Sequence, residues 1–406
     1  MSGRHPFARL LSASFISQVG SYFLTLALVT FVYQKSGSIV RSSLVFVFSY
    51  LPAVLVSGYL GSILDRLISR RLLIINEAVS AAVSALCGLC LVLAAPLPVL
   101  CVVLSLRSVL LFVARTGGSK WIKVISPQSM QDARIKIFFL IFFLSTAIAG
   151  VLAATVLSWG SIFTVVALDV GTYLSSMVVL FTLPPLPTPE RAAAASSGGT
   201  RSSLGTIAEI LRTPALATPF LLVGFSQATF QGAYGVFVSY LPIHQLKLGT
   251  SGVGLFQLAA SFGITCGFLI NWFFAARLTA WTRRALPVAL IATIGAMSLM
   301  VAANSMVVPL SLGVFFLQSC AYEVLWLASS AAFFRESPSE RTARYQFALS
   351  ATGAFLMAAA TLFYSLAIDW LGSGRGSAWV LGIGLCLWAM SHLVVWRATR
   401  APKEKR

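Results

Sequence analysis

Acidic side chains are scarce in this sequence, and charged side chains of either sign are few. The 406 residues include 11 Asp and Glu, and all charged residues together make up 10% of the chain, whereas hydrophobic residues make up 58%. Soluble globular proteins use about 25% charged residues. The composition therefore excludes an ordinary water-soluble domain.

The sequence also lacks the motifs of several enzyme classes. It has no G-x-x-x-x-G-K-[ST] segment, which argues against ATP hydrolysis by a P-loop, and no G-x-S-x-G segment for a nucleophilic serine. The histidines His5, His244 and His392 are scattered and cannot form a metal cluster with one another. We therefore expect no catalytic residue, no cofactor and no bound metal.

Long apolar runs dominate the chain instead. Each run has about 17 to 25 residues, enough to cross a hydrocarbon core of roughly 30 Å as a helix that satisfies its own backbone groups. The predicted spans are residues 9–33, 42–62, 72–95, 97–114, 134–158, 160–183, 215–241, 251–276, 285–303, 307–334, 342–370 and 376–397. The sequence thus predicts an all-α membrane protein with twelve transmembrane helices.

The basic residues alternate from loop to loop. If the N-terminus is cytoplasmic, the opposite side holds Lys35, Arg41, Lys247 and Arg375, Arg107 lies inside a span, and every other one of the 29 lysines and arginines is cytoplasmic. This distribution is typical of the positive-inside rule. It predicts a multi-pass protein of the cell inner (cytoplasmic) membrane with both termini cytoplasmic. The net charge of +18 is thereby explained without a nucleic-acid partner.

One long polar segment divides the chain. Residues Pro184–Thr213 are rich in Pro, Ala, Ser and Gly, which predicts a flexible cytoplasmic linker. The expected organisation is an N-terminal six-helix bundle over 1–183, the linker over 184–213, and a C-terminal six-helix bundle over 214–406.

The two halves resemble each other. Ser17-Gln18 in the first span recurs as Ser226-Gln227 in the seventh, and Arg70-Arg71 after the second span recurs as Arg283-Arg284 after the eighth. Parallel repeats of this kind predict pseudo-symmetric bundles with a substrate site at their interface near the midplane, and alternating access by rocking about that site.

The loop after the second predicted span carries a family motif. Residues 61–71 read GSILDRLISRR, which resembles the cytoplasmic loop motif G-x-x-x-D-R-x-G-R-R of the major facilitator superfamily. The second glycine of the motif is Ile68 here, and its next basic residue is Ser69. The matching positions are Gly61, Asp65, Arg66, Arg70 and Arg71.

Other residues resemble one branch of that superfamily. Leu51-Pro52, Phe163 with Asp169, and Leu183–Pro187 look like the branch of macrolide exporters and enterobactin-type siderophore exporters. The resemblance implies the major facilitator fold. The fifth span departs from it, since Ser145–Gly150 lacks the proline and most of the glycines of the family's proton-antiport exporters.

The motif has a physical interpretation as a gate. A small residue at Gly61 allows close helix approach, and Asp65 can face the positive N-terminal end of the eleventh helix near Pro338–Glu340, which would latch the cytoplasmic side. For Arg66, Arg70 and Arg71 the alternative is that they are ordinary positive-inside charges.

A few charged residues fall inside the predicted spans: Arg107, Glu323, Glu77, Asp169 and Asp369. An ionised side chain at the bilayer centre costs about 2.5–3.5 kcal/mol on insertion scales, so each needs a partner or a watery cavity. In the superfamily the first, fourth, seventh and tenth helices line the central cavity. The resemblance therefore singles out Arg107 and Glu323.

Each of these two residues has two interpretations. A carboxylate in a low-dielectric cavity can exchange a proton near neutral pH, so Glu323 is the preferred coupling residue; the alternative is a hydrogen-bonded strut between helices. Arg107, within a segment that resembles the fourth-helix arginine motif of proton coupling, either faces the cavity or forms a structural pair with Glu77 or Asp169.

Polar and aromatic residues on the cavity helices are candidates for substrate contact. Those close in sequence recur at i, i+3 or i, i+4, so each set shares a helix face, and buried amides with aromatic walls suit amphipathic molecules. The alternative for each is packing between helices or contact with lipid. The candidates are Gln18, Tyr22, Gln227, Gln231, Tyr234, Tyr322 and Trp326. Gly263-x-x-x-Gly267 predicts close helix packing instead of a site.

The leading expectation is a monomeric secondary active transporter that works by alternating access in the lipid bilayer. It would use protons as coupling ion to export a small amphipathic organic compound, such as a siderophore, drug or natural product. The alternatives are an uptake permease for a siderophore or nutrient, a lysophospholipid flippase, and a non-transporting sensor or assembly partner on a transporter scaffold.

Overall fold

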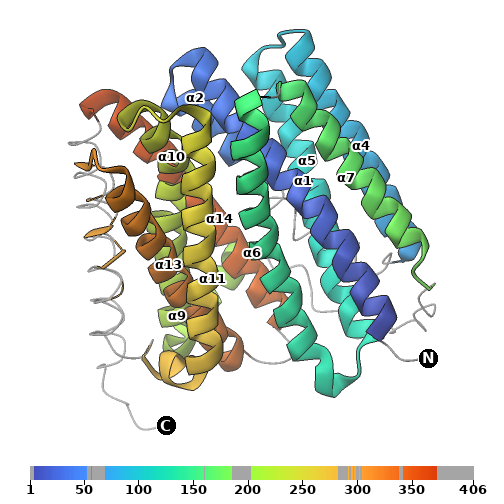
Figure 1. Ribbon diagram of the computed structural model, residues 1–406. Coiled ribbons are helices and arrows are strands. Elements are labelled where there is room, and N and C mark those ends of the chain that lie inside the picture. Colours follow the sequence, from blue (N-terminus) through green and yellow to red (C-terminus); the bar gives the residue numbers. More distant parts are fainter. Residues whose placement is uncertain are drawn as a thin grey trace. The chain divides into compact units, whose positions relative to one another are not determined.

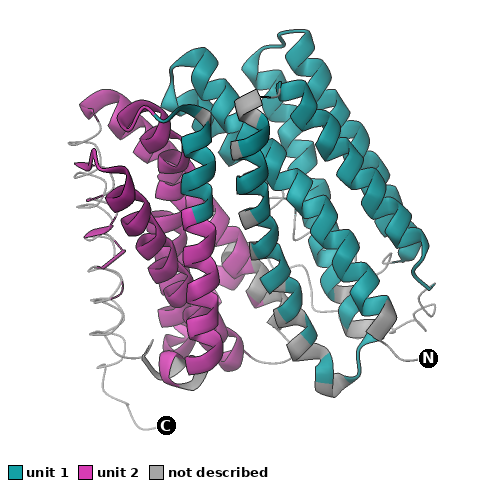
Figure 2. Ribbon diagram, in the orientation of Figure 1, with its two compact units in different colours: residues 1–200, 248–258 teal, residues 201–247, 259–406 magenta. Residues whose placement is uncertain are grey.

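The computed structural model of the chain describes residues 4–52, 56, 69–159, 161–184, 203–281, 291, 294, 295, 297, 298, 301, 304–337 and 342–372. Within these residues every regular element is a helix (Figure 1). The chain divides into two compact units, unit 1 with residues 1–200 and 248–258 and unit 2 with residues 201–247 and 259–406 (Figure 2). Residues 248–258, from the sequence's second half, thus group with unit 1.

Unit 1 is built mainly from the helices of the N-terminal half. Helix α1 packs against α7 and α6, and α4 packs against α7 and α5. The side-chain oxygens of Ser38, Ser69 and Ser161 accept backbone N–H groups at the starts of α2, α4 and α7, which is why these helices begin there. The helices are α1 (Arg4–Ser36), α2 (Ile39–Phe48), α4 (Arg70–Val92), α5 (Leu97–Ile125), α6 (Gln128–Trp159) and α7 (Ile162–Phe181).

The second half of the chain contains two π-helical stretches within one long span. Residues 214–245 pass from α9 through η1, α10 and η2, close to the predicted span 215–241. The elements are α8 (Ser203–Arg212), α9 (Pro214–Ser226), η1 (Gln227–Gln231), α10 (Gly232–Tyr240), η2 (Leu241–Gln245), α11 (Gly249–Trp281), α13 (Val308–Glu336) and α14 (Thr342–Leu371).

The prediction of a flexible linker over Pro184–Thr213 is wrong for its last part. Residues Ser203–Arg212 form helix α8. Ile210 is fully buried in a cluster that includes Leu216 and Phe220 of α9, and Ile207 packs against the same cluster. The apolar spacing of Ile207 and Ile210 gives α8 a hydrophobic side, which the Ser- and Gly-rich residues before it concealed. Residues 185–202 of the linker lie outside the described residues.

Seven of the described helices are long and apolar enough to cross a membrane, and an eighth span results if the bent pair Gly205–Arg212 and Pro214–Gln245 counts as one. The bend of 116° comes at Pro214, which starts α9. The predicted spans 42–62 and 285–303 extend outside the described residues, and 376–397 lies wholly outside them.

The close packing predicted for Gly263 and Gly267 is confirmed in unit 2. A Cβ atom added to Gly267 of α11 would lie 2.7 Å from the carbonyl oxygen of Cys320 and 2.7 Å from the Cβ of Glu323 on α13. At Gly263 an added Cβ would overlap the carbonyl oxygen of Phe316. These glycines therefore set the distance between α11 and α13 and bring α11 against Glu323.

Gly263→Ala is expected to destabilise the protein by about 1–3 kcal/mol, because the added methyl meets backbone that cannot rotate away. The measurement is the melting temperature of the purified protein in detergent. The matched control is Gly313→Ala on α13, where an added Cβ meets nothing within 4 Å and the melting temperature should stay near that of the wild type. Equal melting of the two variants would contradict the close α11–α13 contact.

Candidate functional site

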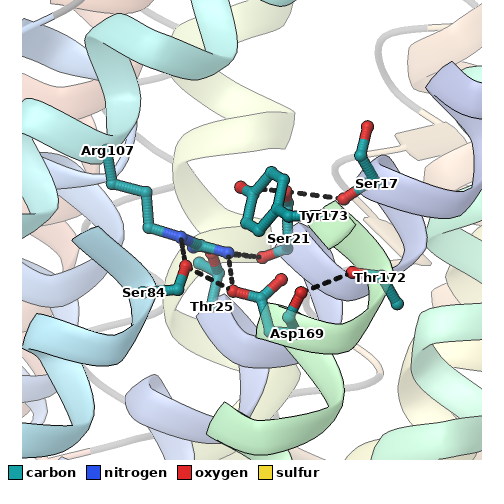
Figure 3. A network of polar contacts seen from close by, with 8 residues as sticks. All are labelled: Ser17, Ser21, Thr25, Ser84, Arg107, Asp169, Thr172 and Tyr173. Carbon is teal, nitrogen blue, oxygen red and sulfur yellow. Dashed lines mark hydrogen bonds and ion pairs between the residues drawn. The ribbon is translucent and has the colours of Figure 1, made fainter. Parts of the chain in front are cut away.

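Arg107 of α5 forms an ion pair with Asp169 of α7 inside unit 1. The Nη2 atom lies 2.9 Å from Oδ2 of Asp169, and the two side chains are 5% and 0% exposed (Figure 3). The sequence left open whether Arg107 faces the cavity or pairs with Glu77 or Asp169. The structure contains the pair with Asp169. The pair holds α5 and α7 together across the interior of the unit.

Hydroxyl groups from two further helices complete the shell of Arg107. Its Nη1 donates to Oγ1 of Thr25 at 3.1 Å, and its Nε donates to Oγ of Ser84 at 3.3 Å. Ser84 in turn donates to Oδ2 of Asp169 at 2.7 Å. Hydrogen bonds to charged groups are stronger than those between neutral groups, so this network fixes the guanidinium in place (Figure 3).

The backbone of α1 contributes as well. The Nη2 of Arg107 donates to the carbonyl oxygen of Ser21 at 3.2 Å, and the Ser21 hydroxyl lies 2.7 Å from the Tyr173 hydroxyl. Gly20 allows α1 to lie close to α7, since a Cβ added to this glycine would lie 2.7 Å from Oδ1 of Asp169. Four residues of this network were not predicted from the sequence: Ser21, Thr25, Ser84 and Tyr173. The four-residue spacing of the hydroxyls of Ser21 and Thr25 on α1 could have indicated two of them.

A small pocket lies beside this network, and it is called the unit 1 pocket below. Its cavity volume is about 10 Å³, which suits one water-sized group. The pocket brings together the predicted cavity residues Tyr22 and Arg107, whereas Gln18, one turn away on α1, is buried and does not line it. The lining residues are Ser21, Tyr22, Thr25, Ser49, Tyr50, Leu104, Arg107, Ser108, Leu111 and Tyr173.

A second arginine reaches the edge of this pocket. The Nη2 of Arg115 donates to the Tyr22 hydroxyl in a short hydrogen bond, and its guanidinium lies 3.6 Å from the centroid of the Phe142 ring. Tyr22 meets the same ring edge-on, with centroids 5.2 Å apart. Arg115 follows the predicted span 97–114 and was therefore expected in a cytoplasmic loop, but α5 continues past it to Ile125.

Glu323 of α13 is fully buried in unit 2, and neither carboxylate oxygen has a hydrogen-bond partner among the described residues. The nearby amide of Asn271 donates instead to carbonyl oxygens, that of Gly267 at 3.0 Å and that of Glu323 itself at 3.4 Å. The hydrogen-bonded strut proposed as the alternative role of Glu323 therefore finds no donor in the part of the chain that the structure describes.

Three predicted substrate residues of unit 2 share one stripe. Gln227, Gln231 and Tyr234 are half-buried, while most of the residues around them from α9 to α10 are buried. The two glutamines are the first and last residues of the π-helical turn η1, and such turns are frequent at functional sites. Tyr234 also stacks on Phe315, with ring centroids 6.2 Å apart.

The two candidates on α13 lie one turn apart. Tyr322 is buried and Trp326 half-buried, and their rings stack with centroids 6.4 Å apart. Both belong to an apolar cluster with Phe225 and Phe230, so packing within unit 2 accounts for much of their surface.

The predicted gating motif is described only at its end. Gly61, Asp65 and Arg66 lie outside the described residues. Arg70 donates through Nη1 to the carbonyl oxygen of Leu183 at 2.6 Å, just after α7, and Arg71 is exposed. A basic side chain at a helix C-terminus interacts favourably with its carbonyl groups, so Arg70 has a structural contact within unit 1.

Comparisons with known proteins extend over almost the whole chain. A family model described as Major Facilitator Superfamily matches residues 10–361. No curated protein matches the chain.

Among solved structures, a bacterial homologue of the human lysosomal transporter Spinster, inward-facing and unoccupied, is similar at 12% identity and TM-score 0.75, over 98% of this chain and 97% of that one. The nucleoside transporter NupG is similar at 14% identity and TM-score 0.75, over 97% and 99%. A POT family transporter in complex with 5-aminolevulinic acid follows at 13% identity and TM-score 0.72, over 97% and 96%. At these identities the likeness shows the fold alone.

Proposed function

Because the chain belongs to the major facilitator superfamily and is thus a multi-pass secondary transporter, we propose that it uses the proton gradient to export a small amphipathic organic compound. Glu323 carries the coupling in this proposal, and Arg107 with its partner Asp169 keeps the N-terminal helices in register. The protein acts as a monomer in the cytoplasmic membrane with both termini in the cytoplasm, and Asp65 serves in the cytoplasmic gate.

The observation that supports proton coupling is the buried carboxylate of Glu323, which has no hydrogen-bond partner among the described residues. An ionised carboxylate at this depth costs about 2.5–3.5 kcal/mol, and no described donor offsets that cost. When Glu323 binds a proton, the carboxyl group becomes neutral and this cost disappears. Release of the proton requires a conformation in which water or a substrate reaches the carboxylate. Proton occupancy is thereby tied to the conformational state, which is what coupling requires.

Two features of the sequence bear on direction. Leu51-Pro52 and Leu183–Pro187 resemble the branch of macrolide and siderophore exporters, which favours efflux. Uptake of a siderophore or nutrient is the alternative, because α6 runs as one helix through Ser145–Gly150 without the proline of the proton-antiport exporters.

The proposal predicts that cells lacking the gene contain several-fold more of the transported compound than cells carrying the gene. The measurement is untargeted metabolite profiling of cells and spent medium, with a strain in which the gene is restored as control. Dissipating the proton gradient with a protonophore should abolish the difference between the strains. A compound left unused in the medium of the deletion strain would instead establish uptake, and a changed lysophospholipid distribution between leaflets would establish a flippase.

A further inference from the structure

One face of α5 carries two arginines toward the unit 1 pocket. Leu104, Arg107, Ser108 and Leu111 line the pocket and recur at helical spacing, so the next position on that face is Arg115. Arg115 reaches the pocket lining through its hydrogen bond to Tyr22.

The charges of the described residues around this pocket do not cancel. Arg107 is neutralised by Asp169 at 2.9 Å. Arg115 has no carboxylate partner among the described residues; it rests on the Phe142 ring, and its Nε is buried without a hydrogen-bond acceptor. The other buried carboxylate among the described residues of unit 1, Glu77, lies two turns along α4 from Ser84 and does not line the pocket. Among the described residues, one formal positive charge is therefore left over.

Donors for an anion remain at both arginines. Nη1 of Arg107 has two N–H groups and gives one to Thr25, so a second is left among the described contacts. The guanidinium of Arg115 keeps its Nε–H, and the hydroxyls of Tyr22 and Tyr50 line the same pocket. Guanidinium groups with neighbouring hydroxyls match the oxygens of a carboxylate or a phosphate.

From this geometry we propose that the unit 1 pocket binds an acidic group, and that the compound moved is an amphipathic organic anion bearing a carboxylate or phosphate. The inference rests on the proposed transport function. A cavity of about 10 Å³ accepts one small polar group and not a whole organic molecule, so the apolar remainder lies outside it.

Simple aromatic probes test the site on the purified full-length protein in a neutral detergent. Benzoate and phenyl phosphate are compared with the neutral isostere benzamide, and affinity is taken from the ligand-dependent rise in melting temperature. At least one anion is expected to bind tenfold or more tightly than benzamide, as charge-assisted hydrogen bonds allow. If neither anion exceeds benzamide, the proposal is wrong.

Variants assign the preference to the pocket. Arg115→Gln should reduce the preference for the anion to about twofold or less. Arg134→Gln is the matched control, because Arg134 likewise donates to a hydroxyl, that of Ser126 at 3.0 Å, and lies over a ring, that of Phe7, but neither Ser126 nor Phe7 lines the pocket. Should Arg115→Gln fail to fold, Tyr22→Phe should weaken anion binding several-fold. An unchanged preference in the pocket variants, or an equal loss in Arg134→Gln, would overturn the assignment.

The metabolite comparison separates this proposal from the transport function. If the gene moves a compound that is neutral or cationic, the transport function stands and the anion proposal fails. A different outcome is that anions bind at the pocket while the deletion strain neither retains a compound in its cells nor leaves one unused in its medium. In that case the transport function fails, and the anion site is supported.

Discussion

Asp169→Asn is expected to destabilise the protein by about 3–5 kcal/mol, one of the largest effects of any single substitution in unit 1. The variant leaves the guanidinium of Arg107, 5% exposed, without its counter-charge at 2.9 Å. Ser84 also loses its charged acceptor. The measurement is the melting temperature and the monodisperse fraction of the purified protein in detergent.

Two comparisons isolate the charge from the packing. The double variant Arg107→Leu with Asp169→Leu removes both charges and should recover most of the loss, because replacing a buried pair by apolar residues is often neutral. Glu336→Gln breaks the pair of Glu336 with Arg335, whose side chains are 29% and 55% exposed and 3.9 Å apart, and should cost less than about 1 kcal/mol. Melting of Asp169→Asn at the wild-type temperature would show that the two groups are not paired.

The helices could be predicted well from the sequence because hydrophobic length is a strong signal in a membrane. The predicted span 342–370 corresponds to α14 over Thr342–Leu371, and 307–334 to α13 over Val308–Glu336. Helix α8 was missed, because its few apolar residues follow a long Ser-, Ala- and Gly-rich segment. The π-helical turns η1 and η2 could not be predicted, since they depend on how the side chains of neighbouring helices pack and leave no trace in hydropathy.

The site was predicted in part, and the reason for each gap is physical. The cost of a charge in an apolar span marked Arg107 together with four acidic residues, and the family resemblance singled it out from these. The choice between Asp169 and Glu77 as its partner depends on how α4 and α7 are rotated about their axes. Arg115 was missed because the apolar run ends near residue 114, whereas α5 continues to Ile125. Hydropathy averaged over a window does not detect a polar stretch of helix beyond a span. Arg115 lies in such a stretch.

Glu323→Gln is expected to reduce proton-driven transport at least tenfold while leaving the protein folded. Glutamine has nearly the same shape, and the carboxylate has no described hydrogen bond to lose, so melting in detergent should stay near that of the wild type. The amide cannot bind and release a proton, so the step that ties proton occupancy to conformation is removed. The measurement is the retained compound in a deletion strain that carries the variant gene, with and without a protonophore.

Glu336→Gln is the matched control for this prediction, because it makes the same chemical change at the end of the same helix but at a partly exposed position. It should restore the wild-type distribution of the compound. Full transport by Glu323→Gln would mean that a group other than Glu323 carries the proton. Asp169 is not a suitable substitute, because its charge is paired with that of Arg107. Transport that is lost in Glu323→Gln but equally lost in Glu336→Gln would instead point to α13 as a structural element, with the buried carboxylate playing no separate part in coupling.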